Sequence, residues 1–174
     1  MDSTRIVVYE RSVLDWNTDV VGLMYADYDY LERYAQNKDQ KRPFILCEYA
    51  HAMGNSLGGI KEYWDLFKKH DKLQGGFIWD FQDQGLLTKT KDGRPYFAYG
   101  GDFGPEGIPS DHNFLNNGLI AADKSLNPHM LEAKAAYQNI EFSKTKILGQ
   151  IRIRNNHFFK DLSNVMFKWS LMEN

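Results

Sequence analysis

Apolar residues gather into four short runs in the first half of the chain, and each run has the length of a β-strand. The runs cover residues 5–9, 19–25, 44–48 and 75–81. The first three are almost continuous in apolar side chains, which is typical of strands that are buried on both faces of a parallel sheet. We therefore predict four strands in this half of the chain.

Helical patterns separate the last three runs. Tyr30, Leu31 and Tyr34 recur at helical spacing within residues 27–36. A second apolar stripe follows an i, i+3, i+7, i+10 pattern and consists of Leu57, Ile60, Trp64 and Phe67. Ser56 is the predicted N-cap of this second helix. The alternation of strand and helix predicts a parallel α/β topology.

The pattern becomes irregular between residues 82 and 127, where glycine and proline are frequent and aromatic side chains argue against disorder. A short helix is predicted at residues 130–138. Residues 147–154 and 165–172 then alternate between apolar and polar positions, as antiparallel strands do. Four parallel strands are too few for a closed barrel, which typically has about eight. The sequence therefore predicts a piece of a larger barrel that is followed by the beginning of a β-sandwich.

Composition narrows the class of protein. The 174 residues provide enough chain for one domain, or for one domain and part of another. A net charge of −2 without a basic stripe gives no indication of a nucleic-acid partner. We also expect no membrane partner, because no apolar run approaches the roughly 20 residues of a transmembrane helix. Cys47 is the single cysteine and excludes an internal disulfide. Without an apolar signal region near the N-terminus, we expect a cytoplasmic protein.

Glu48 is the first candidate for chemistry. Its carboxylate ends a buried strand, where an unpaired charge is costly to desolvate. One interpretation is catalysis, since catalytic groups lie at the strand ends of α/β barrels. The other is a structural ion pair with an arginine. Position alone does not decide between them.

Several motifs resemble the large multidomain β-galactosidases of glycoside hydrolase family two. The first, ILCEYAHAMGNS at residues 45–56, resembles the nucleophile signature of that family. Further matches follow in the same order at residues 74–80 (QGGFIWD), 99–104 (YGGDFG), 117–119 (NGL) and 127–129 (NPH). The resemblance therefore covers nearly the whole chain.

The resemblance implies that residues 1–138 are the second half, strands five to eight, of a TIM (β/α)8 barrel. It implies that residues 139–174 begin an immunoglobulin-like β-sandwich. In the family, the acid/base glutamate lies in an Asn-Glu motif after strand four, and no such motif occurs in these residues. The family's magnesium ligands belong to that same earlier half of the barrel. We therefore expect the general acid and the magnesium ligands to lie outside this chain.

The resemblance also assigns roles near the nucleophile. Glu48 matches the nucleophile, and Tyr25 matches an active-site tyrosine whose hydroxyl is positioned to donate to it. His51 matches a histidine that contacts galactose hydroxyls, and Trp79 ends a strand where its indole can pack against a sugar ring. From the residues alone, Tyr25 and Trp79 also fit as core aromatics, and His51 fits as a loop residue that caps backbone groups.

Phe114 and Asn117 match a sodium site of the family, in which the phenylalanine carbonyl and the asparagine side chain are ligands and the ion contacts the sugar 6-hydroxyl. Asn117 is thereby also a substrate-binding residue. Oxygen ligands suit a hard cation such as sodium. The third protein ligand is a carboxylate outside this chain, so we expect an incomplete site. The alternative is an ordinary Asn-Gly turn.

The functional prediction is a retaining β-galactosidase that removes terminal non-reducing β-D-galactose from β-galactosides such as lactose, with Glu48 as nucleophile. One alternative is a non-catalytic fragment or an assembly subunit that needs a complementary chain. Another is a different glycosidase of the same family, a β-glucuronidase or a β-mannosidase. Because open strand edges and apolar faces promote association, we also expect self-association unless a complementary chain covers them.

Overall fold

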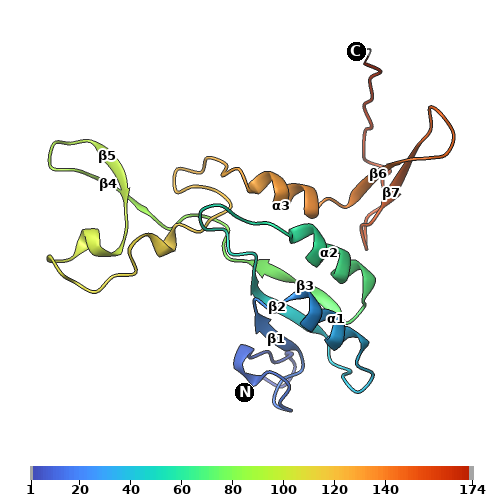
Figure 1. Cartoon of the computed structure of the whole chain (residues 1–174), viewed down its shortest axis with the longest axis horizontal. Coiled ribbons are helices and arrows are strands. Elements are labelled where there is room, and N and C mark those ends of the chain that lie inside the picture. The colour runs from blue at the N-terminus through green and yellow to red at the C-terminus, as the bar shows by residue number, and fades with distance from the viewer. Residues whose placement is uncertain (1, 173–174) are drawn as a thin grey trace. The chain divides into compact units, whose positions relative to one another are not determined.

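The computed structural model describes residues 2–172, which divide into two compact units, residues 2–136 and 137–172. The first unit contains a three-stranded parallel sheet, an additional hairpin and three α-helices. The second contains a two-stranded antiparallel sheet. Figure 1 labels these elements along the chain.

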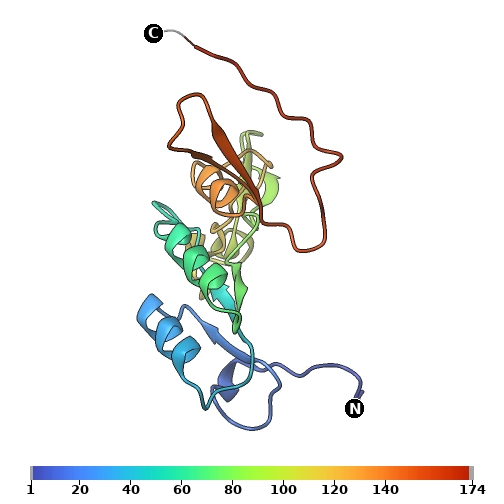
Figure 2. The ribbon, with the colours of Figure 1, turned by 90° about the vertical axis from the view of Figure 1, so that its right-hand side faces the viewer.

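The parallel sheet organises the first unit. Its strands are β1 (Val21–Met24), β2 (Phe44–Tyr49) and β3 (Leu73–Ile78), and they pair in the order β1-β2-β3. Helix α1 (Tyr28–Gln36) joins β1 to β2, and α2 (Ile60–Lys69) joins β2 to β3. Both helices lie on the same side of the sheet (Figures 1 and 2). The predicted α/β alternation with parallel strands is confirmed.

The core lies between this sheet and its helices. Phe44 and Leu46 of β2 are fully buried, and the Tyr34 ring of α1 lies 5.0 Å from the Phe44 ring between centroids. Gly76 of β3 allows the close approach of β2, because a Cβ at this position would lie 2.8 Å from atoms of both Leu46 and Tyr49. Burial of these apolar side chains is the main stabilising contribution of the unit.

The helix starts follow local capping rules only in part. Asp27 caps α1, and its side chain accepts a hydrogen bond from the Tyr30 amide at 2.7 Å. The predicted Ser56 cap of α2 is wrong, because the helix begins at Ile60 after Gly59, which adopts a left-handed conformation with φ of 71°. The Ser56 hydroxyl is buried and has no partner among the described residues.

Residues 5–9 do not form the predicted strand. They make only a single parallel bridge, Val8 to Val20, and Ile6 is 78% exposed. Arg42 holds the following segment in a loop, since its guanidinium donates to the carbonyls of Leu14, Asp15 and Thr18. Beyond the bridge to Val20, residues 5–9 make no strand pairing within the described part of the chain.

The stretch expected to be irregular contains a hairpin. Strands β4 (Leu86–Lys89) and β5 (Pro95–Ala98) pair antiparallel, and Figure 1 shows them extending away from the parallel sheet. Short 3-10 helices at Gly100–Phe103 and His112–Leu115 follow. The chain then forms α3 (Met130–Ala136), slightly shorter than the predicted helix.

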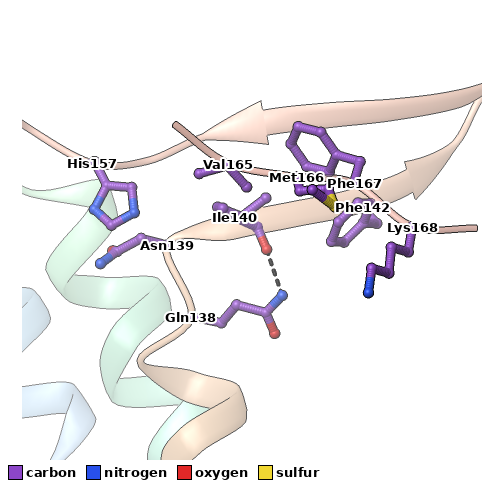
Figure 3. Close-up of a pocket in the computed structure, with 9 residues that line it drawn as sticks. All are labelled: Gln138, Asn139, Ile140, Phe142, His157, Val165, Met166, Phe167 and Lys168. Carbon is purple, nitrogen blue, oxygen red and sulfur yellow. Dashed lines mark hydrogen bonds between the residues drawn. The ribbon is translucent and has the colours of Figure 1, made fainter. Parts of the chain in front are cut away.

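The second unit begins with β6 (Ile140–Lys144) and β7 (Ile151–Asn155), which pair antiparallel. Residues 165–172 do not form the predicted strand. Residues 165–168 instead border a cavity of about 430 Å³ beside β6, where Phe167 packs edge-on to Phe142 (Figure 3). One hairpin is too little to define a sandwich, so the immunoglobulin-like assignment stays a prediction.

Many apolar side chains of the first unit face outward. Phe77 of β3 and Phe81 just beyond it are 63% and 64% exposed. Natural proteins seldom leave such residues uncovered beside an open sheet edge. Among the described residues, no helix has both the length and the apolar character needed to cross a bilayer.

Candidate functional site

The predicted site residues gather at the carboxyl ends of the three parallel strands. Tyr25 follows β1, Glu48 lies near the end of β2, and Trp79 follows β3. Backbone hydrogen bonds tie these ends together, from the Tyr25 amide to the Glu48 carbonyl at 2.9 Å and from the Trp79 amide to the Tyr49 carbonyl at 3.1 Å. This edge is where α/β barrels carry their active sites.

Tyr25 and Glu48 interact directly. Burial, followed by the charge of Glu48 and hydrogen bonding toward its carboxylate, raises the pKa of Tyr25 to about 12. The Tyr25 backbone has a φ of 52°, in the left-handed region that aromatic residues rarely adopt. Strained backbone of this kind tends to occur at functional sites, where surrounding contacts hold it in place.

The raised pKa makes a pH-dependent contribution to stability. The contribution is fully present below about pH 10, where the unfolded tyrosine ionises, and is lost as the pH rises toward 12. We therefore expect Tyr25→Phe to reduce the loss of stability between about pH 10 and pH 12, measured as the urea midpoint of unfolding. Tyr9→Phe is the matched control, because Tyr9 is 57% exposed. An unchanged pH dependence in Tyr25→Phe would contradict the assignment.

His51 connects the nucleophile end of the site with the loop that carries Phe114. Its ring centroid lies 6.2 Å from that of Tyr25 and 5.4 Å from that of Phe114. The Nε2 atom is buried and has no hydrogen-bond partner among the described residues. Buried polar atoms are nearly always paired, so this nitrogen is suited to a polar group that the described residues do not supply.

Asn117 is the most deeply buried of the predicted site residues, with 1% of its surface exposed. Its Nδ2 donates to the Phe114 carbonyl at 2.9 Å, whereas its Oδ1 is buried and has no partner among the described residues. Trp79, Phe114 and Asn117 border one cavity of about 540 Å³. The cavity is large enough to accept a ligand of the size of a sugar ring.

Sequence reasoning missed several residues of this cavity, among them Gln84, Ser110 and Asp111. Gln84 also donates to Oδ2 of Asp80 at 2.7 Å. Gln84, Ser110 and Asp111 lie in a stretch of the sequence without helical or strand periodicity. No signal in the sequence could have placed them beside Trp79.

The structure brings the predicted residues together in two groups. Glu48, Tyr25 and His51 form the first, and Trp79, Phe114 and Asn117 form the second. The contact between the His51 and Phe114 rings joins them. Within residues 2–172, no three His, Cys, Asp or Glu side chains gather closely enough to hold a metal ion.

Comparison with known proteins identifies one family and several similar β-galactosidases. Residues 1–142 match the family described as glycosyl hydrolases family 2, TIM barrel domain. The chain is 44% identical over 177 residues to a β-galactosidase of Priestia megaterium, a match that covers 99% of this chain and 17% of the relative. It is 40% identical over 187 residues to a β-galactosidase of Alteromonas mediterranea, covering 99% of the chain and 18% of the relative. A β-galactosidase of Leuconostoc mesenteroides is 41% identical over 189 residues, with the same two coverages. The chain thus spans less than a fifth of the length of these relatives.

Proposed function

The chain belongs to glycosyl hydrolase family 2, and from this membership we propose that it contains the nucleophile-bearing part of a retaining β-galactosidase active site. The observation that carries the proposal is the juxtaposition of Tyr25 and Glu48 at the carboxyl edge of the parallel sheet, where the Tyr25 amide donates to the Glu48 carbonyl at 2.9 Å and the charge of Glu48 helps to raise the pKa of Tyr25. A carboxylate at this edge is accessible to substrate and is oriented by a phenol that stays neutral at physiological pH.

Glu48 attacks the anomeric carbon of the galactoside in the proposed mechanism. The bond between that carbon and the leaving oxygen breaks while a glycosyl-enzyme ester forms. Tyr25 orients the carboxylate by donating its hydroxyl proton into a hydrogen bond, and no proton is transferred. Retaining glycosidases hold a second carboxyl group about 5–5.5 Å from the first, which protonates the leaving oxygen and then activates water for hydrolysis of the ester. We propose that residues outside this chain supply that group.

Recognition of the sugar is proposed for the residues around the cavity. Nε2 of His51 and Oδ1 of Asn117 have no partner within residues 2–172, and we propose that sugar hydroxyl groups pair with them. Trp79, 37% exposed, presents a ring against which the apolar face of a sugar can pack. Polar groups of this kind fix the orientation of a ligand in a largely preformed pocket.

A sodium ion fits part of this arrangement. The orphaned Oδ1 of Asn117 and the nearby carbonyl of Phe114 are neutral oxygen donors of the type that hard cations prefer. We propose these two as ligands, with the remaining ligand from outside the chain. A bound sodium would supply electrostatic attraction for a sugar hydroxyl. The magnesium ligands expected from the family remain a proposal for residues outside this chain.

The lining of the cavity favours a neutral sugar over a glucuronide. The described residues that border it include Asp111 and no lysine or arginine. A hexuronic acid carries a carboxylate, which proteins usually bind with a cationic partner. This argument disfavours a β-glucuronidase. It does not distinguish galactose from mannose, for which the expectation rests on the sequence motifs.

The proposal can be tested in a chimera in which this chain replaces the matching part of the Priestia megaterium relative. We expect the chimera to hydrolyse an aryl β-D-galactoside and to release β-galactose first, as followed by proton NMR. Aryl β-D-glucuronides and β-D-mannosides are the comparison substrates. Release of α-galactose first, or preference for either comparison substrate, would overturn the proposal. The predicted cytoplasmic location and the absence of nucleic-acid and membrane partners stay predictions.

A further inference from the structure

The backbone amide and the backbone carbonyl of Gly118, the residue directly after Asn117, are both hydrogen-bonded by side chains. Its amide donates to Oδ1 of Asp83 at 2.8 Å. Its carbonyl accepts from Nδ2 of Asn127 at 2.9 Å and lies 2.9 Å from Nε2 of His129. Because a carbonyl can only accept, Nε2 of His129 carries the hydrogen in this contact. Asp83, Asn127 and His129 are called the Gly118 clamp below.

The clamp acts on a segment that is already tightly packed. The amide of Asp80 donates to the Asn117 carbonyl at 2.7 Å, and the amide of Leu119 donates back to the Asp80 carbonyl at 3.0 Å. A Cβ on Gly118 would lie 2.1 Å from the Asp83 amide nitrogen, so no other residue fits there without displacing the backbone. The segment at residues 117–119 therefore has little freedom to shift relative to Asp80, just beyond β3.

The clamp also borders a cavity close to the site. Its three residues line this cavity of about 270 Å³ together with residues 54–56, from the loop that follows the nucleophile strand. His129 is 9% exposed and Asn117 is 1% exposed, so both are sheltered from solvent. Hydrogen bonds in such surroundings are strong when made and costly when lost.

We propose that Asp83, Asn127 and His129 are positioning residues that set the affinity for the sugar by fixing the orientation of Asn117. This inference rests on the proposed function, because it takes Asn117 as the residue that recognises the 6-hydroxyl side of galactose. The clamp residues touch the Gly118 peptide and not the reacting atoms. They determine where Oδ1 of Asn117 points within the cavity shared with Trp79 and Phe114.

The most informative variant is Asp83→Leu in the chimera. It removes the acceptor for the Gly118 amide while keeping the branched shape and the number of side-chain heavy atoms. We expect KM for the aryl β-galactoside to rise roughly ten- to hundredfold, while kcat changes by less than about threefold. Asp83→Asn retains an acceptor oxygen and should restore most of the affinity. Asp39→Leu, at an exposed loop position, is the matched control and should leave both constants unchanged.

A substrate that lacks the 6-hydroxyl separates positioning from general damage. We expect Asp83→Leu to reduce the preference for β-D-galactoside over β-D-fucoside, its 6-deoxy analogue, toward the value of Asn117→Ala. Hydrogen exchange should also show faster exchange of the Gly118 amide in Asp83→Leu. If Asp83→Leu fails to unfold cooperatively, Asn127→Leu carries the same test.

An unchanged preference between galactoside and fucoside, with the parent chimera active, would overturn the clamp proposal and leave the proposed function intact. A parent chimera without β-galactosidase activity would overturn the proposed function itself. Equal losses of kcat for both substrates would identify the clamp as merely structural.

Discussion

Replacing Glu48 with glutamine should lower the turnover of an aryl β-galactoside by the chimera by roughly a thousandfold or more. The amide has nearly the same shape as the carboxylate, but it cannot form the glycosyl-enzyme ester. The backbone hydrogen bond from the Tyr25 amide to the carbonyl of residue 48 is unaffected, so the fold around the strand ends should be retained. Initial rates at saturating substrate provide the measurement.

Two controls make the Glu48 result specific. Glu106→Gln changes an exposed carboxylate in the long loop and should retain full turnover. A 2-fluoro-galactoside should trap the covalent intermediate, and peptide mapping should locate the label on Glu48. Label on another residue, or turnover by Glu48→Gln close to that of the parent, would refute the nucleophile assignment.

A polypeptide of these 174 residues alone should self-associate in solution. Its turnover of an aryl β-galactoside should be at least about a thousandfold lower than that of the chimera. Activity is expected to be low because the retaining mechanism needs a second carboxyl group, and the Asn-Glu motif that carries it in the family is absent from these residues. Association is expected because β3 exposes Phe77 beside an open edge. Turnover and light scattering across a dilution series measure the two effects.

The variant Phe77→Lys tests the cause of association. It should reduce the scattering mass without restoring activity, whereas Lys38→Ala, on an exposed loop, should change neither. Addition of a polypeptide containing the missing part of the Priestia megaterium relative should restore turnover. A compact monomer at all concentrations would contradict the association, and chimera-like turnover by the chain alone would contradict the need for outside residues.

Local sequence rules predicted those parts of the fold for which neighbouring residues supply the physical cause. Asp27 caps α1 through a contact three residues away, and the apolar residues of β2 face helices whose stripes are readable at helical spacing. The rules failed where long-range contacts decide. Arg42 fixes a loop at residues 14–18 from more than twenty residues away, and residues 5–9 make a single bridge within the described part of the chain.

The candidate site shows the same division. The sequence alone marked Glu48, since a carboxylate that ends a buried strand needs a compensating partner. The resemblance to a family then suggested roles for Tyr25, His51 and Asn117. It could not reveal that the Nε2 of His51 and the Oδ1 of Asn117 are both buried without partners among the residues that the structure describes.

Sequence by itself determined the alternation of strands and helices, the position of the nucleophile candidate at a strand end, and the family. These properties depend on periodicity and on motifs that are contiguous in the chain. Only the tertiary structure decided the juxtaposition of Tyr25 and Glu48, the cavity beside Trp79 and the clamp on Gly118. The physical reason is that each of these joins residues from segments far apart in the chain, whose meeting depends on strand register and backbone hydrogen bonds that no local pattern encodes.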